Sequence, residues 1–364
     1  MTRVSSDVNQ CEGLMPVREI HRFDEQVLTS YLSSVLSGFA GPVSVRQFAG
    51  GQSNPTFHIG TPEKDYVLRK KPPGKLIASA HAVDREYRIQ AALRESGVPV
   101  PRVLHFCDDD SVIGTSFYVM ENLPGRILRN PLLPDMDAAE REAIYGAMNV
   151  TLARLHNLDW KAAGLEDYGR PDGYIARQVA LWSRQYEACK TGDVPAMDCL
   201  MRWLPDNVPA DHSASIVHGD FRLENLMFDQ AQPRVIAVLD WELSTLGHPL
   251  SDLAFNCMTY HLPCDNSIAR GFVGADIAAL GIPSEADYVS AYCNRTGRDG
   301  IGDWPFFMAF SLFRTAAIQQ GVYARALKGT ASSETAHEFG RMFAFVAERG
   351  WTLVEESGQE GSRV

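Results

Sequence analysis

The pattern of hydrophobic and polar positions along this chain changes near residue 121. Before that point, short segments rich in β-branched and aromatic residues are separated by polar turns, a pattern typical of β-strands. One longer segment, at about 80–95, has the period of a helix instead. The sequence therefore predicts a β-rich domain over residues 24–121, with strands at 43–48, 56–59, 65–70 and 116–120.

After a connection punctuated by Pro124 and Gly125, the hydrophobic period becomes helical. Asp137 and Glu140 have the spacing of a capping box at the start of the first helix. One face of that helix is expected to carry Ile144, Met148, Leu152 and Leu155. Residues 122–357 are thus predicted to form a mainly helical domain, with further helices at 173–190, 194–203, 251–261, 284–294, 305–327 and 334–356.

Residues 215–240 interrupt this helical domain. Three short apolar segments, at 216–218, 226–228 and 234–239, have strand character and surround two polar turns. We interpret them as a short hairpin within the helical domain. Polar loops displayed by rigid strands are frequent places for binding and catalytic residues, so the chemistry is expected here.

Composition narrows the classes of function. The 34 basic and 45 acidic residues give a net charge of -11, which opposes binding to nucleic acid. The seven cysteines form no C-x-x-C pair, and this favours reduced thiols and a cytoplasmic setting. No apolar run has the length of a signal peptide or a membrane helix, so no membrane association is expected.

The strongest chemical signal is His218-Gly219-Asp220, followed by Asn225 and, after an apolar strand, by Asp240. An amide and a carboxylate oxygen are hard donors of the kind that Mg²⁺ prefers when it binds nucleotide phosphates. Each residue alone could have a structural role, since Asp and Asn routinely cap turns and end strands. The ordered set of three favours a functional role.

These residues belong to a longer series of motifs, in which the sequence resembles the aminoglycoside phosphotransferase-like family of small-molecule kinases. The resemblance spans roughly Phe48 to Asp252, and is closest to the branch found fused to acyl-CoA dehydrogenases. Its motifs are Gly50-Gly51-Gln52-Ser53-Asn54-Pro55-Thr56, Tyr66-Val67-Leu68-Arg69-Lys70-Lys71-Pro72-Pro73-Gly74, Arg85-Glu86-Tyr87, Val217-His218-Gly219-Asp220 through Asn225, Asp240-Trp241-Glu242 and Gly247-His248-Pro249-Leu250-Ser251-Asp252.

The resemblance implies an α+β, two-lobed protein-kinase-like fold, with a small β-rich N-terminal lobe and a larger, mainly helical C-terminal lobe carrying the short catalytic hairpin. It implies that ATP and Mg²⁺ are used, that Asp220 is the catalytic base or orienting carboxylate, and that Asn225 and Asp240 bind the metal. Glu121 and Leu123 occupy the expected hinge that contacts adenine. His218 is expected to be structural, and His248 and Asp252, at the start of the following helix, are expected to cap that helix and brace the loop.

In the small lobe, Arg69 matches the family position that contacts the α- and β-phosphates. Lys71 remains a rival, because alternate residues of a strand share a face. Glu86 lies on the inward face of the helix at 80–95, where pairing with Arg69 would satisfy its charge. The structural alternatives are an exposed basic edge strand for Arg69 and a carboxylate reaching water for Glu86.

The turn at 50–55 lacks the G-x-G-x-x-G pattern, and alone it reads as a hairpin turn. With its flanking motifs, the turn could offer the backbone N–H groups of Gly51 and Ser53 to phosphate.

The chain also departs from protein kinases. Gly219 stands where their catalytic loop has Arg, and no A-P-E motif follows Asp240. These departures favour a small-molecule substrate over a protein substrate. The helices at 173–190 and 305–327 are expected to define specificity, with Arg222, Trp241, Glu242 and Arg314 as candidates.

The predicted function is transfer of the γ-phosphate of ATP to a hydroxyl of a small metabolite, with a hydroxyacyl-CoA as one acceptor. The alternatives are an aminoglycoside or sugar kinase and, from another class, a non-catalytic nucleotide-binding scaffold. A metallophosphoesterase is disfavoured because the motifs that would complete a two-metal site are missing from the sequence.

Overall fold

The computed structural model describes residues 13–49, 54–72, 82–266, 270–329 and 334–361. The chain divides into two compact units. Unit 1 comprises the chain up to Ile127 together with Met227–Glu242, and unit 2 comprises Leu128–Leu226 and the chain from Leu243 onwards.

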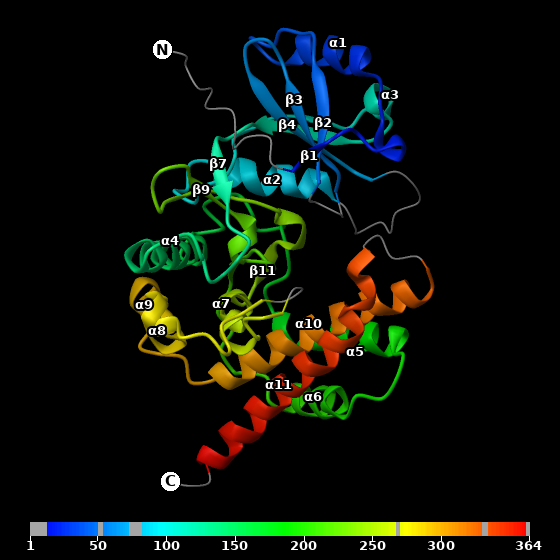
Figure 1. Cartoon of the computed structure of the whole chain (residues 1–364). Helices are drawn as coiled ribbons and strands as arrows, with labels where there is room; N and C mark the ends of the chain where they lie inside the picture. Colours follow the sequence, from blue (N-terminus) through cyan, green and yellow to red (C-terminus); the bar gives the residue numbers. More distant parts are fainter. Residues whose placement is uncertain (1–12, 50–53, 73–81, 267–269, 330–333, 362–364) are drawn as a thin grey trace. The chain divides into compact units, whose positions relative to one another are not determined.

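Unit 1 is built on a six-stranded antiparallel sheet with the strand order β1-β2-β3-β4-β6-β5. Strands β1, β2, β3 and β4 of this sheet are labelled in Figure 1. The strands expected at 43–48, 56–59, 65–70 and 116–120 are all present within one residue or so of those bounds. In this register Arg69 of β4 lies opposite Thr56 of β3 and Tyr118 of β6. The six strands are β1 (Leu14–Met15), β2 (Ser44–Phe48), β3 (Thr56–Gly60), β4 (Asp65–Lys70), β5 (Val103–Cys107) and β6 (Phe117–Glu121).

The two faces of this sheet are covered by different helices, because strand side chains alternate between faces. Helices α1 (Glu25–Val35) and α3 (Asp110–Ile113) pack on the face that carries Phe57, Leu68 and Val119. Helix α2 (Val83–Leu93) packs on the opposite face. The sequence predicted α2, but it missed α1, whose first turn is capped by the Asp24 carboxylate accepting from Gln26 and Val27 N–H.

The three strands that we predicted as one hairpin belong to two different sheets. Strands β9 (Leu226–Asp229) and β10 (Val235–Val238) form a three-stranded sheet with β7 (Gly125–Ile127) in unit 1. Strand β8 (Ser215–Val217) pairs instead with β11 (Thr245–Gly247) in unit 2. The partner strands β7 and β11 have three residues each, too few to show a strand pattern in sequence.

This pairing also changes the grouping of the segment that ends in Asp240. We expected residues 227–242 within the helical domain at 122–357, whereas they group with unit 1. The remaining boundaries, at 24–121 and 122–357, stay a prediction.

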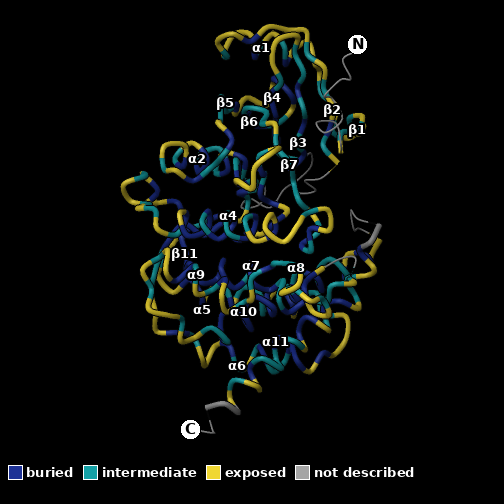
Figure 2. The backbone as a smooth tube through the Cα atoms, turned by 60° about the vertical axis from the view of Figure 1, so that its left-hand side comes forward, coloured by how far each residue is buried: buried dark blue, intermediate teal, exposed yellow. Residues whose placement is uncertain are grey.

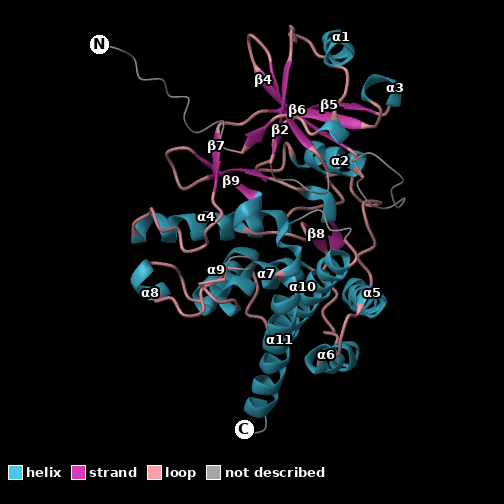
Figure 3. Ribbon diagram, turned by 45° about the vertical axis from the view of Figure 1, so that its right-hand side comes forward, coloured by secondary structure: helices cyan, strands magenta, loops and turns pink. Residues whose placement is uncertain are grey.

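Unit 2 is mainly helical, and its core is formed around α10 (Trp304–Leu327), which runs through it as largely buried backbone (Figure 2). Helices α5, α7 and α11 pack against α10. The capping box predicted for α4 is confirmed, since Glu140 N–H bonds to Asp137 and Asp137 N–H to Glu140. The other helices of unit 2 (Figure 3) are α4 (Ala138–His156), α5 (Tyr174–Cys189), α6 (Pro195–Asp206), α7 (Pro249–Cys257), α8 (Ile277–Leu280), α9 (Glu285–Thr296) and α11 (Phe339–Gly361).

Single turns of 3-10 helix complete the description, at η1 (Glu19–His21), η2 (Leu223–Asn225), η3 (Trp241–Leu243), η4 (Met258–His261) and η5 (Glu334–His337). Among the described residues, no helix is both long and apolar enough to cross a membrane. The six cysteines within the described segments are free.

Candidate functional site

Arg69 is the centre of a buried ionic cluster in unit 1. Its Nε lies 2.8 Å from Oε2 of Glu86, and one terminal nitrogen lies 2.6 Å from Oδ1 of Asp240. The side chains of Arg69 and Glu86 are 9% and 1% exposed, and that of Asp240 is 30% exposed. The expected pairing of Arg69 with Glu86 is therefore confirmed, and neither structural alternative for these two residues holds.

Two neutral side chains complete the coordination of the Glu86 carboxylate. Asn54 Nδ2 donates to Oε1 over 2.6 Å, and the Tyr118 hydroxyl donates to Oε2 over 3.1 Å. These bonds matter because a buried carboxylate loses its hydration and must be satisfied by protein donors. We call Asn54, Arg69, Glu86, Tyr118 and Asp240 the Arg69 cluster. Neither Asn54 nor Tyr118 was predicted as a site residue, although Asn54 follows Ser53 in a quoted motif and Tyr118 lies in the strand predicted at 116–120.

Burial and charge act in different directions on the two buried charges of the Arg69 cluster. Burial, together with repulsion from Asp240, raises the pKa of Glu86, although Arg69 and the two neutral donors oppose this shift. Burial disfavours the charged guanidinium, but the carboxylates of Glu86 and Asp240 outweigh this effect and raise the pKa of Arg69. The cation is therefore permanently charged at physiological pH, and it holds the Asp240 carboxylate in a fixed direction. A fixed, partly exposed carboxylate can bind a metal ion or accept a hydrogen bond from a proton-bearing group.

Asp240 has an unusual backbone conformation, with a φ angle of 64°. This left-handed region is uncommon for residues with a side chain, although Asp tolerates it better than most. The turn continues into η3, where the buried Trp241 donates from its indole nitrogen to the carbonyl oxygen of Val238 over 3.0 Å. Glu242 follows, with its carboxylate 3.9 Å from Arg69. The Asp240-Trp241-Glu242 motif thus forms a tight turn at the end of β10.

The remaining predicted residues of unit 1 lie outside the Arg69 cluster. Gly51 and Ser53 lie outside the described residues. Glu121 ends β6, and its carboxylate accepts a 2.8 Å hydrogen bond from the backbone N–H of Arg102. Leu123 is half-buried in the connection between β6 and β7, and Lys71 is half-buried after β4. Their contacts with a nucleotide stay a prediction.

In unit 2, the segment from His218 to Asn225, which we call the Asp220 loop, brings together two of the predicted residues. Asn225 Nδ2 donates to Oδ2 of Asp220 over 2.9 Å and to its backbone oxygen over 2.8 Å. On the other side, Arg222 Nε lies 3.3 Å from Oδ1 of Asp220. The Asp220 side chain is 22% exposed, whereas Arg222 is 51% exposed. One carboxylate oxygen is thus held by a buried neighbour and the other by a solvated one.

The backbone of the Asp220 loop is held by Asp252 of α7. Its two carboxylate oxygens accept from the N–H groups of His218, over 2.6 Å, and of Gly219, over 2.8 Å. Burial alone would raise the pKa of Asp252. The hydrogen bond from His156, the charge interactions with His156 and His218, and the hydrogen bond from the Gly219 N–H together hold this pKa below its usual value. The expected loop-bracing role of Asp252 is confirmed.

Histidines play structural parts here. His218 is fully buried, and its Nδ1 accepts from the Asp220 N–H over 3.2 Å. His248 caps α7, because its Nδ1 accepts from the Leu250 N–H. Both roles match the expectations from sequence. His156, which no motif marked, was missed because its contact with Asp252 joins residues 96 positions apart.

Asn225 and Asp240 both carry oxygen atoms suited to Mg²⁺. Because Nδ2 of Asn225 donates to Asp220, its Oδ1 is the atom left for a cation. Each of these oxygens is of the kind that Mg²⁺ binds, since Mg²⁺ usually takes one or two protein oxygens and completes its shell with water and phosphate. Among the described residues, no group of three or more His, Cys, Asp or Glu side chains is placed to hold a metal ion.

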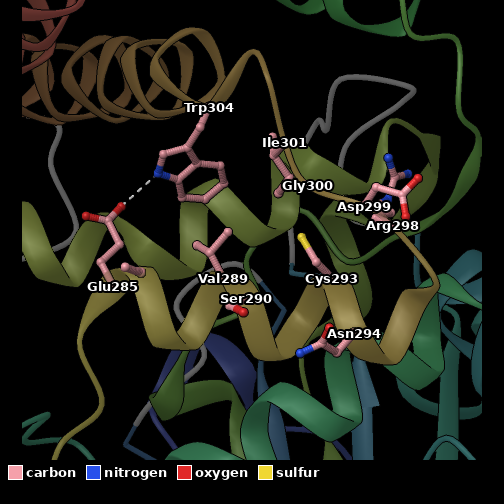
Figure 4. A pocket seen from close by; sticks show the side chains of 11 residues that line it. Glu285, Val289, Ser290, Cys293, Asn294, Arg298, Asp299, Gly300, Ile301 and Trp304 are labelled. Carbon is pink, nitrogen blue, oxygen red and sulfur yellow. Dashed lines mark hydrogen bonds between the residues drawn. The ribbon is translucent and has the colours of Figure 1, made fainter.

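A pocket of about 430 Å³ lies elsewhere in unit 2, between α9 and the start of α10 (Figure 4). Its walls include Val289 and Cys293 of α9, Ile301 of the following loop and Trp304 of α10. Trp304 donates from its indole nitrogen to Glu285 over 3.0 Å at one end of the pocket (Figure 4). None of the predicted site residues lines this pocket.

Known proteins resemble this chain at several levels. The model of the phosphotransferase enzyme family matches residues 44–288. Mouse acyl-CoA dehydrogenase family member 10 is 47% identical over 344 residues, which are 94% of this chain and 32% of that protein. The chain spans less than half the length of the curated relatives that it matches.

Solved structures give the same result. A protein of Ralstonia eutropha JMP134 assigned to the aminoglycoside phosphotransferases is 48% identical, with a TM-score of 0.84 over 92% of this chain and 99% of that chain. A thermostable mutant of another aminoglycoside phosphotransferase, solved with ADP and hygromycin B, is 14% identical, with a TM-score of 0.58 over 90% of this chain and 98% of that one. This second likeness shows the kinase-like α+β fold alone.

Proposed function

The chain belongs to the phosphotransferase enzyme family, and we propose that it transfers the γ-phosphoryl group of ATP to a hydroxyl of a small metabolite. The observation that carries this proposal is the state of the two carboxylates in the predicted motifs. Asp220 and Asp240 are each partly exposed and each held in a fixed direction, Asp220 by the amide of Asn225 and Asp240 by the buried guanidinium of Arg69. Phosphoryl transfer depends mainly on such positioning and on electrostatic stabilisation.

In this proposal, Asp220 orients the acceptor hydroxyl and receives its proton. The bond from Asn225 to Oδ2 fixes the carboxylate, and Oδ1 becomes the atom that meets the acceptor. For this, Arg222 must leave Oδ1, and a half-exposed arginine can do so at little cost because its ion pair is solvated. The buried side of Asp220 thus sets direction, and its solvated side admits the substrate.

The Arg69 cluster has the nucleotide-binding part in this proposal. Arg69 offers its guanidinium to the α- and β-phosphates, while Glu86 keeps it in place through the 2.8 Å ion pair. Asn225 and Asp240 would hold Mg²⁺. The bound Mg²⁺ would supply positive charge that neutralises the phosphates during transfer.

Further contacts with ATP are proposed for the backbone of Gly51 and Ser53, at the phosphates, and for Glu121 and Leu123, at adenine. The distant relative solved with ADP supports a nucleotide substrate through its shared fold. Reduced thiols at the six described cysteines suit a cytoplasmic reaction.

For the acceptor, we propose a hydroxylated acyl compound such as a hydroxyacyl-CoA. The support is the 47% identity to a protein named for acyl-CoA dehydrogenase activity. Aminoglycosides and sugars are the second class of acceptor, supported by the names of the solved structures. Measuring ADP release over a range of concentrations of hydroxyacyl-CoAs, aminoglycosides and sugars distinguishes between the two classes: the proposal expects the acyl compound to give the highest kcat/KM.

The proposal is tested by titrating the purified chain with ATP, with and without Mg²⁺, and following thermal stability. Ligand that binds only the native state must raise the melting temperature. We expect a rise that requires Mg²⁺ and is much smaller in Asp240→Asn. Asp229→Asn, which changes an acidic residue of the neighbouring strand β9, is the matched control and should respond like the unmodified chain. Absence of any ATP effect in folded protein would contradict the proposal.

A further inference from the structure

Arg314, near the middle of α10, is buried against the Asp220 loop. Only 8% of its surface is exposed to solvent. One terminal nitrogen donates to the carbonyl oxygen of Gly219, the residue directly before Asp220, over 2.7 Å. The central helix of unit 2 therefore reaches the backbone of the loop that carries the proposed catalytic carboxylate.

Two aromatic rings hold the Arg314 guanidinium. Its central carbon lies 5.6 Å from the ring centre of Trp182 and 5.4 Å from that of Phe255, within the range of cation–π attraction. The Nε atom is buried and has no hydrogen-bond partner among the described residues. Burial of a charge costs free energy, and here the bond to Gly219 and the two rings are the contacts that offset this cost. The one group that this buried cation reaches by a hydrogen bond in the described part of the chain is the backbone of the Asp220 loop.

The bond from Arg314 completes a clamp on one short stretch of backbone. Gly219 donates its N–H to Asp252 over 2.8 Å and accepts from Arg314 at its carbonyl oxygen. A cation and an anion thus hold opposite ends of the same residue. Backbone groups outside regular structure need such side-chain partners when buried.

The backbone at Gly219 has a conformation that few other residues could adopt. Its φ angle is +84°, and a Cβ atom here would lie 2.8 Å from the carbonyl oxygen of Leu243. The conformation therefore suits glycine alone. Since Asp220 follows directly, the orientation of the Gly219 carbonyl sets the direction in which the Asp220 side chain leaves the backbone.

We propose that Arg314 is a positioning residue for phosphoryl transfer: it holds the Gly219 carbonyl, and thereby aims the Asp220 carboxylate, without touching substrate. This inference rests on the function proposed above for Asp220. Misplacement of a reacting group by about 1 Å can lower a rate by about 100-fold. Loss of the bond from Arg314 therefore lowers the turnover of bound ATP, while the affinity for ATP is retained.

The planar guanidinium is part of this account. It can lie flat between two rings while one N–H points at the carbonyl, whereas the ammonium of a lysine cannot. Arg314→Lys should therefore keep the charge but only part of the positioning, and Arg314→Met should lose both. Arg141→Met is the matched control. Arg141 of α4 is also buried, and it donates to the carbonyl oxygens of Leu133 and Leu280, well separated in sequence from the Asp220 loop.

Two measurements on the full chain test the proposal. The first is hydrogen exchange, followed by mass spectrometry, in the peptide that covers residues 215–226. The second is the slow hydrolysis of Mg-ATP, with water as acceptor, together with the apparent KM for ATP. We expect about tenfold faster exchange in this peptide for Arg314→Met. We also expect a kcat lower by about 10- to 100-fold at unchanged KM.

The variants discriminate between positioning and plain stabilisation. Arg314→Lys should fall between Arg314→Met and the unmodified chain, and it decides the question alone if Arg314→Met does not fold. Arg141→Met should lower the melting temperature without changing kcat or the exchange of this peptide. Unchanged exchange, or faster exchange with unchanged kcat, would overturn the proposal. If the unmodified chain neither binds nor hydrolyses Mg-ATP, the function of Asp220 fails, and the exchange result still decides whether Arg314 holds the loop.

Discussion

Asp240 and Asp220 are carboxylates of similar exposure, but they are held in different ways. Asp240 is fixed by a buried cation whose position in sequence is 171 residues away. Asp220 is fixed by Asn225 and Arg222, within five residues, on a backbone that Asp252 and Arg314 clamp. The first arrangement depends on a balance of buried charge, and the second on the geometry of a loop. Changes in the first should act on stability, and changes in the second mainly on rate.

The largest effect on stability should come from Arg69→Met. This substitution leaves Glu86 buried without its cation, and breaking a buried pair in this way costs about 3–5 kcal/mol. Denaturation in urea measures the loss in the free energy of unfolding. Arg46→Met on β2 is the control, since Arg46 is exposed and makes one backbone contact, and it should cost less than about 1 kcal/mol. Equal losses in both variants would contradict a charge-balanced cluster.

Removing the charges of both Arg69 and Glu86 tests whether the unpaired Glu86 carboxylate causes the loss of stability in Arg69→Met. If the cost in Arg69→Met is the unpaired Glu86 carboxylate, the double variant Arg69→Met/Glu86→Leu should recover about 1–3 kcal/mol of the free energy of unfolding. The same urea experiment measures this recovery. A double variant less stable than Arg69→Met would mean that Glu86 is satisfied by Asn54 and Tyr118 alone.

The second region should respond to pH through a buried histidine at the start of α7. Burial lowers the pKa of His248, which faces Asp211, Arg298 and His156, to about 4. The folded state therefore binds its proton less readily than the unfolded chain, whose histidine has a pKa of about 6.5. This contribution to stability is present above pH 6.5 and is lost as the pH falls toward 4.

Between pH 7 and pH 5, this one histidine should cost about 2 kcal/mol of the free energy of unfolding. His248→Asn keeps a side chain that can cap α7 but removes the titration. The melting temperature of this variant should fall less steeply over that interval than that of the unmodified chain. Parallel curves would show that His248 is not the group responsible.

Asp252→Asn should weaken the clamp on the Asp220 loop. An amide offers one acceptor oxygen where the carboxylate offers two, so one of the N–H groups of His218 and Gly219 loses its charged partner. We expect a loss of about 2 kcal/mol in the free energy of unfolding. The turnover of Mg-ATP should fall while the affinity for ATP is kept. Loss of affinity together with turnover would contradict the separation of the two regions.

The smallest effect is expected from Arg222→Gln. The Arg222 side chain is 51% exposed, and solvated ion pairs contribute at most about 1 kcal/mol. The melting temperature should therefore change little, at low salt and at high salt. A large loss would mean that Arg222 is a fixed part of the loop, and that it does not make way for an acceptor.

The Arg69–Glu86 pairing could be predicted from the sequence because its two motifs are close together along the chain. Asp220 and Asn225 lie five positions apart, and the Arg69–Glu86 pair joins a strand and the helix that follows it, so the pattern was visible without the fold. Asn54 and Tyr118 were missed as partners of Glu86, because only the sheet brings them to the same carboxylate. The three-residue strands β7 and β11 were missed for a similar reason, since their pairing is determined by distant segments.

The central claim is that Asp220 acts on the transferred group while other residues bind the nucleotide. It is tested most directly by measuring the Kd for Mg-ATP and the rate of ADP formation in Asp220→Ala beside the unmodified chain. The account predicts a Kd within about threefold and a rate lower by about 100-fold or more, as for loss of a group that handles a proton. An unchanged rate in folded Asp220→Ala would contradict it.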